Sequence, residues 1–393
     1  MQCTIIGAGI IGLSIGWELA RSGHTVTLVD PEPAGGATHA AAGMLAAVTE
    51  FHRQEADLLA LSVPSAAGWP QWARDLEAAT GLGTGYASPG TLVVAADAAD
   101  REALADLAAA QRAAGLRIGE LGTAAARAAE PLLAPRLAGA FSAPGDAQAD
   151  PRRTARALLG AVEAEPRARV LRQRATAVVP CRGGWSVQVG AGGPEDRMWA
   201  DEVVLATGVG RPGYGSAELG IGGLPERWRR PVRPIHGDVM RLRPTSASWP
   251  PAGPTVRALV GGQGVYILPR SDGEVVVGAT EREDLQNGVS VEGAHRLLRD
   301  ALRVMPALGR FELLEATARA RPGTPDNLPL LGRIAPGLIA ATGFHRHGVL
   351  LSVAAATAVS ALIGPATTGR PRHPPPAALD PHGLDPFDPW RFS

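Results

Sequence analysis

The chain has 393 residues, 45% of them hydrophobic, and its 38 basic residues balance 38 acidic ones. This length is enough for two domains with a buried core each, and zero net charge gives no attraction to nucleic acid or to an anionic membrane. No apolar run reaches the roughly 18 residues that a membrane span needs. Every basic residue is arginine, so a lysine Schiff base is excluded.

The two cysteines, Cys3 and Cys181, are too few for a disulfide framework or a four-thiolate metal site, and we expect no metal. We expect Cys3 to be a small buried hydrophobic residue in the first strand. That strand begins within a few residues of Met1 and leaves no room for a secretory signal, so we expect a cytoplasmic protein.

The first thirty residues carry the strongest pattern. An apolar strand precedes a G-x-G-x-x-G turn formed by Gly7, Gly9 and Gly12, a helix follows, and a second apolar run at residues 25–29 ends at Asp30. The first glycine permits a tight turn, the second lets the backbone approach a pyrophosphate, and the third lets the helix pack on the strand. The helix N-terminus favours phosphates, and Asp30 is placed to accept hydrogen bonds from a ribose. The pattern predicts a dinucleotide-binding unit at residues 1–48.

The next segment, residues 52–140, is rich in alanine and predicts helices, with Trp69 and Trp72 in the core and an amphipathic helix at residues 98–114. Asp150 and Pro151 predict the start of a helix that runs to about residue 165. Strands are then expected near residues 170–171, at 185–189 and at 202–208, the last returning to the first sheet.

The second half predicts short strands between residues 235 and 280, a helix at 293–305, a buried strand at 338–343 and an apolar helix at 349–363. The proline-rich tail from Gly364 predicts little secondary structure. We therefore expect an α/β protein, with a Rossmann-like domain built from discontinuous segments and an inserted β-rich α+β domain. The expected limits are residues 1–48, 141–212 and 315–393 for the nucleotide domain, and 49–140 and 213–314 for the substrate domain.

Four segments together resemble the FAD-dependent amine oxidases of the D-amino acid oxidase superfamily, and within it the glycine oxidases of thiamin biosynthesis. They are the opening turn with Asp30, the run Gly35 to Leu45, the pair of runs 265–270 and 276–280, and Arg321-Pro322-Gly323-Thr324-Pro325-Asp326 leading into residues 343–351. They follow the order of the family along nearly the whole chain. The last pair is the most specific.

The resemblance implies FAD as the cofactor. The helix near residue 349 would then offer its N-terminal N–H groups to the flavin. Arg319 stands where relatives with covalent flavin have a cysteine, so noncovalent FAD is implied. Besides the three glycines of the opening turn, the implied cofactor-binding residues are Ile10, Ile11, Asp30, Pro31, Thr38, Ala42, Gly43, Met44, Thr176, Gly208, Gly343, His345, Arg346, His347, Gly348, Val349 and Leu350.

The resemblance also implies the reaction. Arg321 matches the arginine that binds the substrate carboxylate, Tyr266 matches a substrate-contacting tyrosine, and Arg346 lies near both flavin and substrate. The implied activity is oxidation of glycine, and of sarcosine or small D-amino acids, with O₂ reoxidising the flavin and forming hydrogen peroxide, and with an imine product that feeds thiazole synthesis. The implied partners are a small amino acid and O₂, without nucleic acid or membrane, and self-association stays open.

Other interpretations stay open beside this one. A D-amino acid dehydrogenase or another secondary-amine oxidase would use the same fold, and a non-catalytic flavin-binding protein would keep the cofactor without turnover. The chain also departs from the family at three positions. Glu281 stands where a relative has methionine, His236 replaces a frequent lysine, and His347 replaces an asparagine. A carboxylate at position 281 that faced the pocket would alter the polarity of the substrate site.

Overall fold

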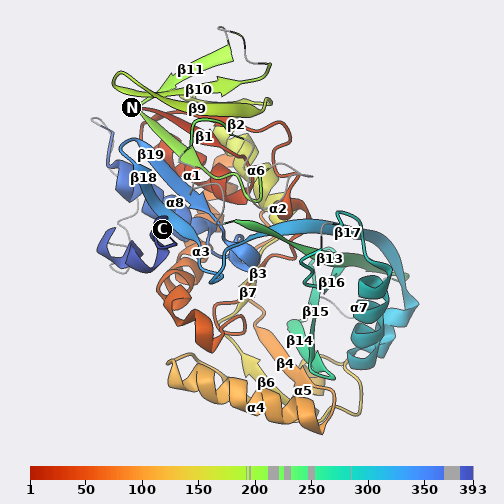
Figure 1. Ribbon diagram of the computed structural model, residues 1–393. Helices are drawn as coiled ribbons and strands as arrows, with labels where there is room; N and C mark the ends of the chain where they lie inside the picture. Colours follow the sequence, from red (N-terminus) through yellow and green to blue (C-terminus); the bar gives the residue numbers. More distant parts are fainter. Residues whose placement is uncertain are drawn as a thin grey trace.

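Two β-sheets organise the computed structural model, which describes residues 1–191, 193, 196–210, 221–224, 232–246, 253–284, 286–366 and 381–392. One sheet has six strands and the other has eight (Figure 1). The long strand β17 (Phe311–Gly323) of the larger sheet contacts helix α2 (Ala37–Ala40) and the 3₁₀ helix at His345–His347.

The six-stranded sheet has the order β18-β19-β12-β1-β2-β8. All neighbouring strands are parallel except β18, which runs antiparallel to β19. The expected return of residues 202–208 to the first sheet is confirmed, because Glu202 pairs with Cys3 and Leu205 with Ile6. The strands are β1 (Gln2–Ile6), β2 (Thr25–Val29), β8 (Ala168–Leu171), β12 (Glu202–Leu205), β18 (Leu330–Ala335) and β19 (Leu338–Thr342).

Helices cover one face of this sheet around a shared apolar core. Trp17, Trp69 and Trp72 are buried there, and the indole of Trp72 lies edge-on at 5.4 Å from Trp17 and 5.0 Å from Trp69. Asp150 caps one helix as expected, accepting hydrogen bonds from the N–H groups of Arg152 and Arg153. The helices are α1 (Ile10–Arg21), α3 (Leu59–Thr80), α6 (Pro151–Ala164) and α8 (Ser352–Ile363).

The helix expected from residue 349 begins three residues later, at Ser352. A separate 3₁₀ helix at His345–His347 and a hydrogen-bonded turn precede it. His345 has a positive φ of 45°, a conformation that an α-helix does not contain. The backbone therefore changes direction at this residue before the helix starts.

A three-stranded antiparallel sheet packs against the other face of the six-stranded sheet, where Val178, Trp185 and Val187 meet Ile6 and Leu205. The expected alternation over residues 185–189 is confirmed, since inward and outward positions alternate along the central strand. The strands are β9 (Ala175–Cys181), β10 (Gly184–Val189) and β11 (Arg197–Ala200).

The eight-stranded sheet has the order β17-β13-β16-β15-β14-β4-β6-β5. Two antiparallel strands, β13 and β17, pair along twelve positions and form its long edge in Figure 1. The strands are β4 (Thr91–Ala95), β5 (Gly119–Leu121), β6 (Gly139–Ala143), β13 (Arg233–Pro244), β14 (Thr255–Val260), β15 (Gln263–Pro269), β16 (Val275–Gly278) and β17 (Phe311–Gly323). The helices of this region are α4 (Ala98–Ala113), α5 (Thr123–Ala129) and α7 (Val291–Val304).

The expectation that residues 52–140 are helical is wrong in part. Helices α3, α4 and α5 are present, but β4 is a fully buried strand between α3 and α4, and β5 is a partly exposed strand between α4 and α5. The five residues of β4 pair in parallel with β14 and antiparallel with β6. Partners distant in the sequence thus decided the conformation of a segment whose composition favours helix.

Short elements complete the chain. They are α2 (Ala37–Ala40), the pair β3 (Met44–Leu45) and β7 (Ala147–Gln148), and 3₁₀ helices at Arg53–Leu58, Pro306–Arg310, His345–His347 and Pro381–Phe387. Of the tail from Gly364, residues 367–380 lie outside the described residues. The part from Pro381 corrects the expectation of little structure, because it forms a 3₁₀ helix whose Phe387 is fully buried.

No helix among the described residues is long and apolar enough to cross a bilayer. We propose the two-domain division stated above, with the six-stranded sheet in one domain and most of the eight-stranded sheet in the other. Strands β6 and β17 run across the proposed limits at residues 141 and 315.

Candidate active site

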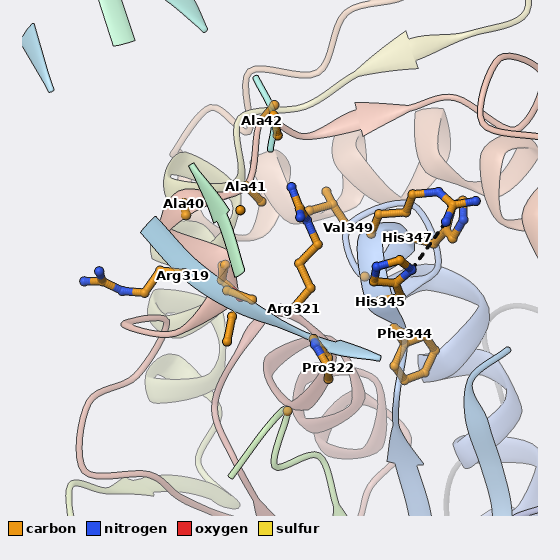
Figure 2. A pocket seen from close by; sticks show the side chains of 18 of the residues that line it. Ala40, Ala41, Ala42, Arg319, Arg321, Pro322, Phe344, His345, His347 and Val349 are labelled. Carbon is orange, nitrogen blue, oxygen red and sulfur yellow. Dashed lines mark hydrogen bonds between the residues drawn. The ribbon is translucent and has the colours of Figure 1, made fainter. Parts of the chain in front are cut away.

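A cavity of about 1360 Å³ opens between the two large sheets. It is lined by the turn after β1, the end of β2, helix α2, strands β13 to β17, and the 3₁₀ helix at His345–His347. Figure 2 shows part of this lining, with Arg321 on one side and His345 and Val349 across from it. Most of the residues that the sequence predicts for cofactor and substrate binding thus line one cavity.

The turn after β1 requires its glycines. Gly7 has a φ of 103°, and a Cβ there would overlap the carbonyl group of Ala206 in the neighbouring segment. A Cβ on Gly12 would overlap the carbonyl oxygen of Gly7. Gly12 therefore allows the helix to pack on the turn, which is the part that the sequence pattern assigned to it.

Side chains hold this turn in place. Asp30 accepts hydrogen bonds from the N–H groups of Ala8 at 2.7 Å and Glu32 at 2.9 Å. The hydroxyl of Thr38 accepts a hydrogen bond from the N–H of Ile10 at 3.0 Å. The first turn of α1 is thereby fixed at the cavity, with N–H groups that have no partner within the helix.

The lining also fits a dinucleotide in its shape and its polar groups. A Cβ built on Gly36 or on Gly208 meets no atom within 4 Å, so open space lies beside both backbones. The hydroxyl of Thr207 is buried and has no hydrogen-bond partner among the described residues. Such a group at a cavity wall is suited to a bound polar ligand. The residues present therefore fit FAD.

Three of the predicted cofactor residues do not line the cavity: Gly12, Thr176 and Gly343. Thr176 donates its hydroxyl hydrogen bond to the carbonyl of Gln188 within the three-stranded sheet, and its neighbours Arg174 and Ala175 face the cavity instead. Gly343 ends β19 with a φ of 77° and packs against Thr324. The other predicted cofactor residues, together with Tyr266, Arg321 and Arg346, all line the cavity.

Arg321 is half-buried on β17, where it pairs with Ile235 of β13. Its Nη1 donates a hydrogen bond to the carbonyl of Thr280 at 3.0 Å. Among the described residues it has no carboxylate within ion-pair distance, so its guanidinium keeps donors for a ligand. A Cβ at position 237 would overlap this guanidinium, and glycine there leaves it room. Figure 2 shows the side chain reaching into the cavity.

Tyr266 lies on β15 and pairs across the sheet with Gly278 of β16. A Cβ at Gly278 would overlap the phenol, so glycine makes the space that the ring occupies. Burial raises the pKa of Tyr266 above its usual value, and the nearby charge of Arg321 opposes that rise. The hydroxyl is therefore protonated at neutral pH and can donate a hydrogen bond.

Arg346 already has two carboxylate partners. Its Nε donates to Glu50 at 2.8 Å and its Nη2 to Glu55, and Glu50 is also paired with Arg257. Burial alone would raise the pKa of Glu55, but His347 and Arg346 hold it at about 2. Burial likewise opposes ionisation of Glu50, and Arg257 and Arg346 hold its pKa well below the usual range. The charge of Arg346 is thus largely neutralised by the protein.

Two histidines flank Arg346 and are buried. His347 Nε2 lies 3.8 Å from Glu55, and burial lowers the pKa of this imidazole. His345 Nε2 lies 3.1 Å from Oε1 of Glu281, and its Nδ1 lies 3.3 Å from Nη1 of Arg346. His236, another departure from the family, lies 3.1 Å from the Asn287 amide oxygen. The three residues at which the chain departs from the family, His236, Glu281 and His347, all line the cavity.

The sequence did not indicate Glu50, Glu55 or Arg257. The two acids belong to an irregular segment and the 3₁₀ helix that follows it, and they reach Arg346 across almost 300 residues of chain. No spacing or motif marks them, and only burial distinguishes them from surface acids. Among the described residues no group of three or more histidine, cysteine or acidic side chains is arranged to hold a metal.

Comparisons with known proteins agree with this geometry. The model of a family described as FAD dependent oxidoreductase matches residues 2–362. Glycine oxidase of Geobacillus kaustophilus is 32% identical over 88% of this chain and 89% of its own length. A crystal structure of glycine oxidase from the same organism has a TM-score of 0.81 and 28% identity, covering 99% of this chain and 98% of the other.

The bifunctional protein ThiO/ThiG of Nostoc sp. is 33% identical over 91% of this chain, but the match covers 52% of that protein. The chain thus spans about half the length of the first curated relatives that it matches. The family match covers most of the chain and includes both large sheets. The chain belongs to the family of FAD dependent oxidoreductases and is an FAD-dependent enzyme of that family.

Proposed function

We propose that this enzyme oxidises glycine, and sarcosine or small D-amino acids, with O₂ as the electron acceptor. The observation that carries the proposal is Arg321, a guanidinium that faces the cavity without a carboxylate partner among the described residues. Binding of FAD alone does not call for such a group. The similarity to glycine oxidase over most of both chains supports the same substrate class.

The residues of this chain bind and orient the substrate. Arg321 would hold the carboxylate through paired charge-assisted hydrogen bonds, and the Tyr266 hydroxyl would donate another. FAD, when bound, supplies the chemistry of accepting a hydride from the α-carbon and passing the electrons to O₂ as hydrogen peroxide. Holding the α-carbon in a reactive orientation contributes much of the rate in such reactions, so no dedicated acid or base is needed here.

We propose further that the cofactor lies along the turn after β1, Asp30 and helix α2, with its flavin toward His345 to Leu350. Two observations support this placement. Open space lies beside the backbones of Gly36 and Gly208, and the buried hydroxyl of Thr207 has no hydrogen-bond partner among the described residues. The imine product would feed thiazole synthesis in thiamin biosynthesis. The relation to a bifunctional ThiO/ThiG protein, which carries a second activity, supports a product that another enzyme consumes.

The test is anaerobic addition of glycine to the purified yellow protein, followed by a peroxide assay in air with glycine, sarcosine, D-alanine and D-proline. We expect bleaching of the flavin absorbance and peroxide formation. Bleaching without peroxide, but with reduction of an added dye, would indicate a dehydrogenase instead. No bleaching by any of the four would indicate a flavin-binding protein without this activity, and faster turnover of benzylamine than of glycine would contradict carboxylate binding.

A further inference from the structure

Glu281 places a second charged group beside the proposed substrate arginine. It directly follows Thr280, the residue whose carbonyl accepts the hydrogen bond from Arg321. Both Glu281 and Arg321 line the same cavity. The side chain of Glu281 is 60% exposed, so its carboxylate is open to a bound ligand.

The position of this carboxylate is set by a buried chain of contacts. Nη1 of Arg346 lies 3.3 Å from Nδ1 of His345, and arginine is only a donor, so Nδ1 is the acceptor. The imidazole hydrogen is then on Nε2, the atom that lies 3.1 Å from Oε1 of Glu281. Arg346 is itself held by Glu50 and Glu55. Glu281 is therefore connected through His345 to the ionic group formed by Arg346, Glu50 and Glu55.

Glu281 keeps a net negative charge in this arrangement. The contact with His345 lowers the pKa of its carboxyl, and the charges of Arg321 and Arg346 act in the same direction. Within ion-pair distance of Glu281, the described part of the chain offers only His345. A substrate whose carboxylate is held by Arg321 therefore shares the cavity with the negative charge of Glu281.

We propose that Glu281 determines specificity by charge: it disfavours substrates that carry a second carboxylate on the amine substituent or side chain. The inference rests on the proposed function, in which Arg321 binds the first carboxylate. Like charges brought together in a site of reduced dielectric oppose binding, and such repulsion is a common means of selecting one ligand over another. An uncharged substituent of the same size avoids this repulsion.

Two ligands that lack an amine and resist oxidation test the proposal in the holoenzyme. Ethoxyacetate carries one carboxylate, and diglycolate has nearly the same size and carries two. Their dissociation constants are measured from the change in flavin absorbance. We expect Glu281→Gln to lower the ratio of the diglycolate constant to the ethoxyacetate constant by about tenfold. Added salt should lower the ratio in the wild type and leave that of the variant nearly unchanged.

The matched control is Glu283→Gln, which removes the same charge two residues away, where Glu283 pairs with Arg233 outside the cavity. A ratio that is unchanged in Glu281→Gln, or that falls equally in Glu283→Gln, would overturn the assignment to Glu281. If ethoxyacetate fails to bind the wild type, the carboxylate site itself is wrong. If a variant does not fold, the dependence of the wild-type ratio on salt concentration still tests the proposal. Failure to oxidise glycine, with the ratio behaving as expected, would reject the proposed reaction alone.

Discussion

Arg321 is the residue on which substrate binding should depend most. We expect Arg321→Ala to lower kcat/KM for glycine by a factor that corresponds to about 2–5 kcal/mol, because a desolvated charge pair loses one partner. FAD content should stay unchanged, and Arg321→Lys should recover only part of the loss, because an ammonium lacks the planar pair of donors. Steady-state kinetics on variants of matched FAD content measures this. Near-normal kinetics of Arg321→Ala would make Arg346 the leading candidate for the residue that binds the substrate carboxylate.

Tyr266 should contribute less than Arg321. Tyr266→Phe removes one hydroxyl that is expected to donate to the substrate carboxylate, and one such bond contributes about 0.5–3 kcal/mol, with the larger values for a charged acceptor. The ring keeps its place over Gly278, so the fold is expected to remain intact. The measurement is kcat/KM for glycine, and a loss larger than that of Arg321→Ala would reverse this order.

Arg346 should affect stability more than binding of substrate. Its removal leaves Glu50 and Glu55 with a buried charge that has lost a partner, and breaking a buried pair from one side costs about 3–5 kcal/mol. We therefore expect Arg346→Ala to lower the free energy of unfolding in a denaturant titration. The control is Arg303→Ala, which removes an exposed arginine of α7 that pairs with Asp97, the residue that caps α4, and should change little.

At the scale of elements, this ionic group joins the 3₁₀ helix at Arg53–Leu58 to the one at His345–His347. Its pH dependence follows from the lowered pKa of Glu55, about 2 in the folded protein against an ordinary value of 4.5. At a pH between these two pKa values, Glu55 is protonated in the unfolded chain and ionised in the folded protein. The free energy of unfolding should therefore fall as the pH drops through this range.

Unfolding by denaturant at a series of pH values tests this expectation. Glu55→Gln removes the titrating carboxyl, so its curve should lie lower at neutral pH and fall less steeply in acid. Identical slopes for the variant and the wild type would show that Glu55 is not the group responsible. Arg257 and Arg346 lower the pKa of Glu50 as well, so Glu50 should account for part of the remaining slope.

At the scale of the whole molecule, the cofactor should be released by acid. Burial raises the pKa of the Cys3 thiol to about 12, so it is not a nucleophile at neutral pH. Cys181 is exposed on β9, and neither cysteine is among the described residues that line the cavity. After acid precipitation the yellow colour should remain in the supernatant. Colour that stays with the pellet would show a covalent flavin.

The sequence by itself determined the elements whose signals are local. The turn with Gly7 and Gly12 was predictable because both positions exclude a Cβ. The capped start of α6 at Asp150 was predictable because its partners are the next residues. Arg321 and Tyr266 were predicted from the resemblance of short segments, and the structure places both at the cavity.

Only the tertiary structure decided the features that depend on distant partners. The alanine-rich segment 52–140 looked helical, but within it β4 pairs with β14 and β6 and is a strand. Arg346 was predicted from a short segment, but its partners Glu50 and Glu55, almost 300 positions away, were not. Charge pairing and strand pairing both join residues through space, so a pattern read along the chain carries no record of them.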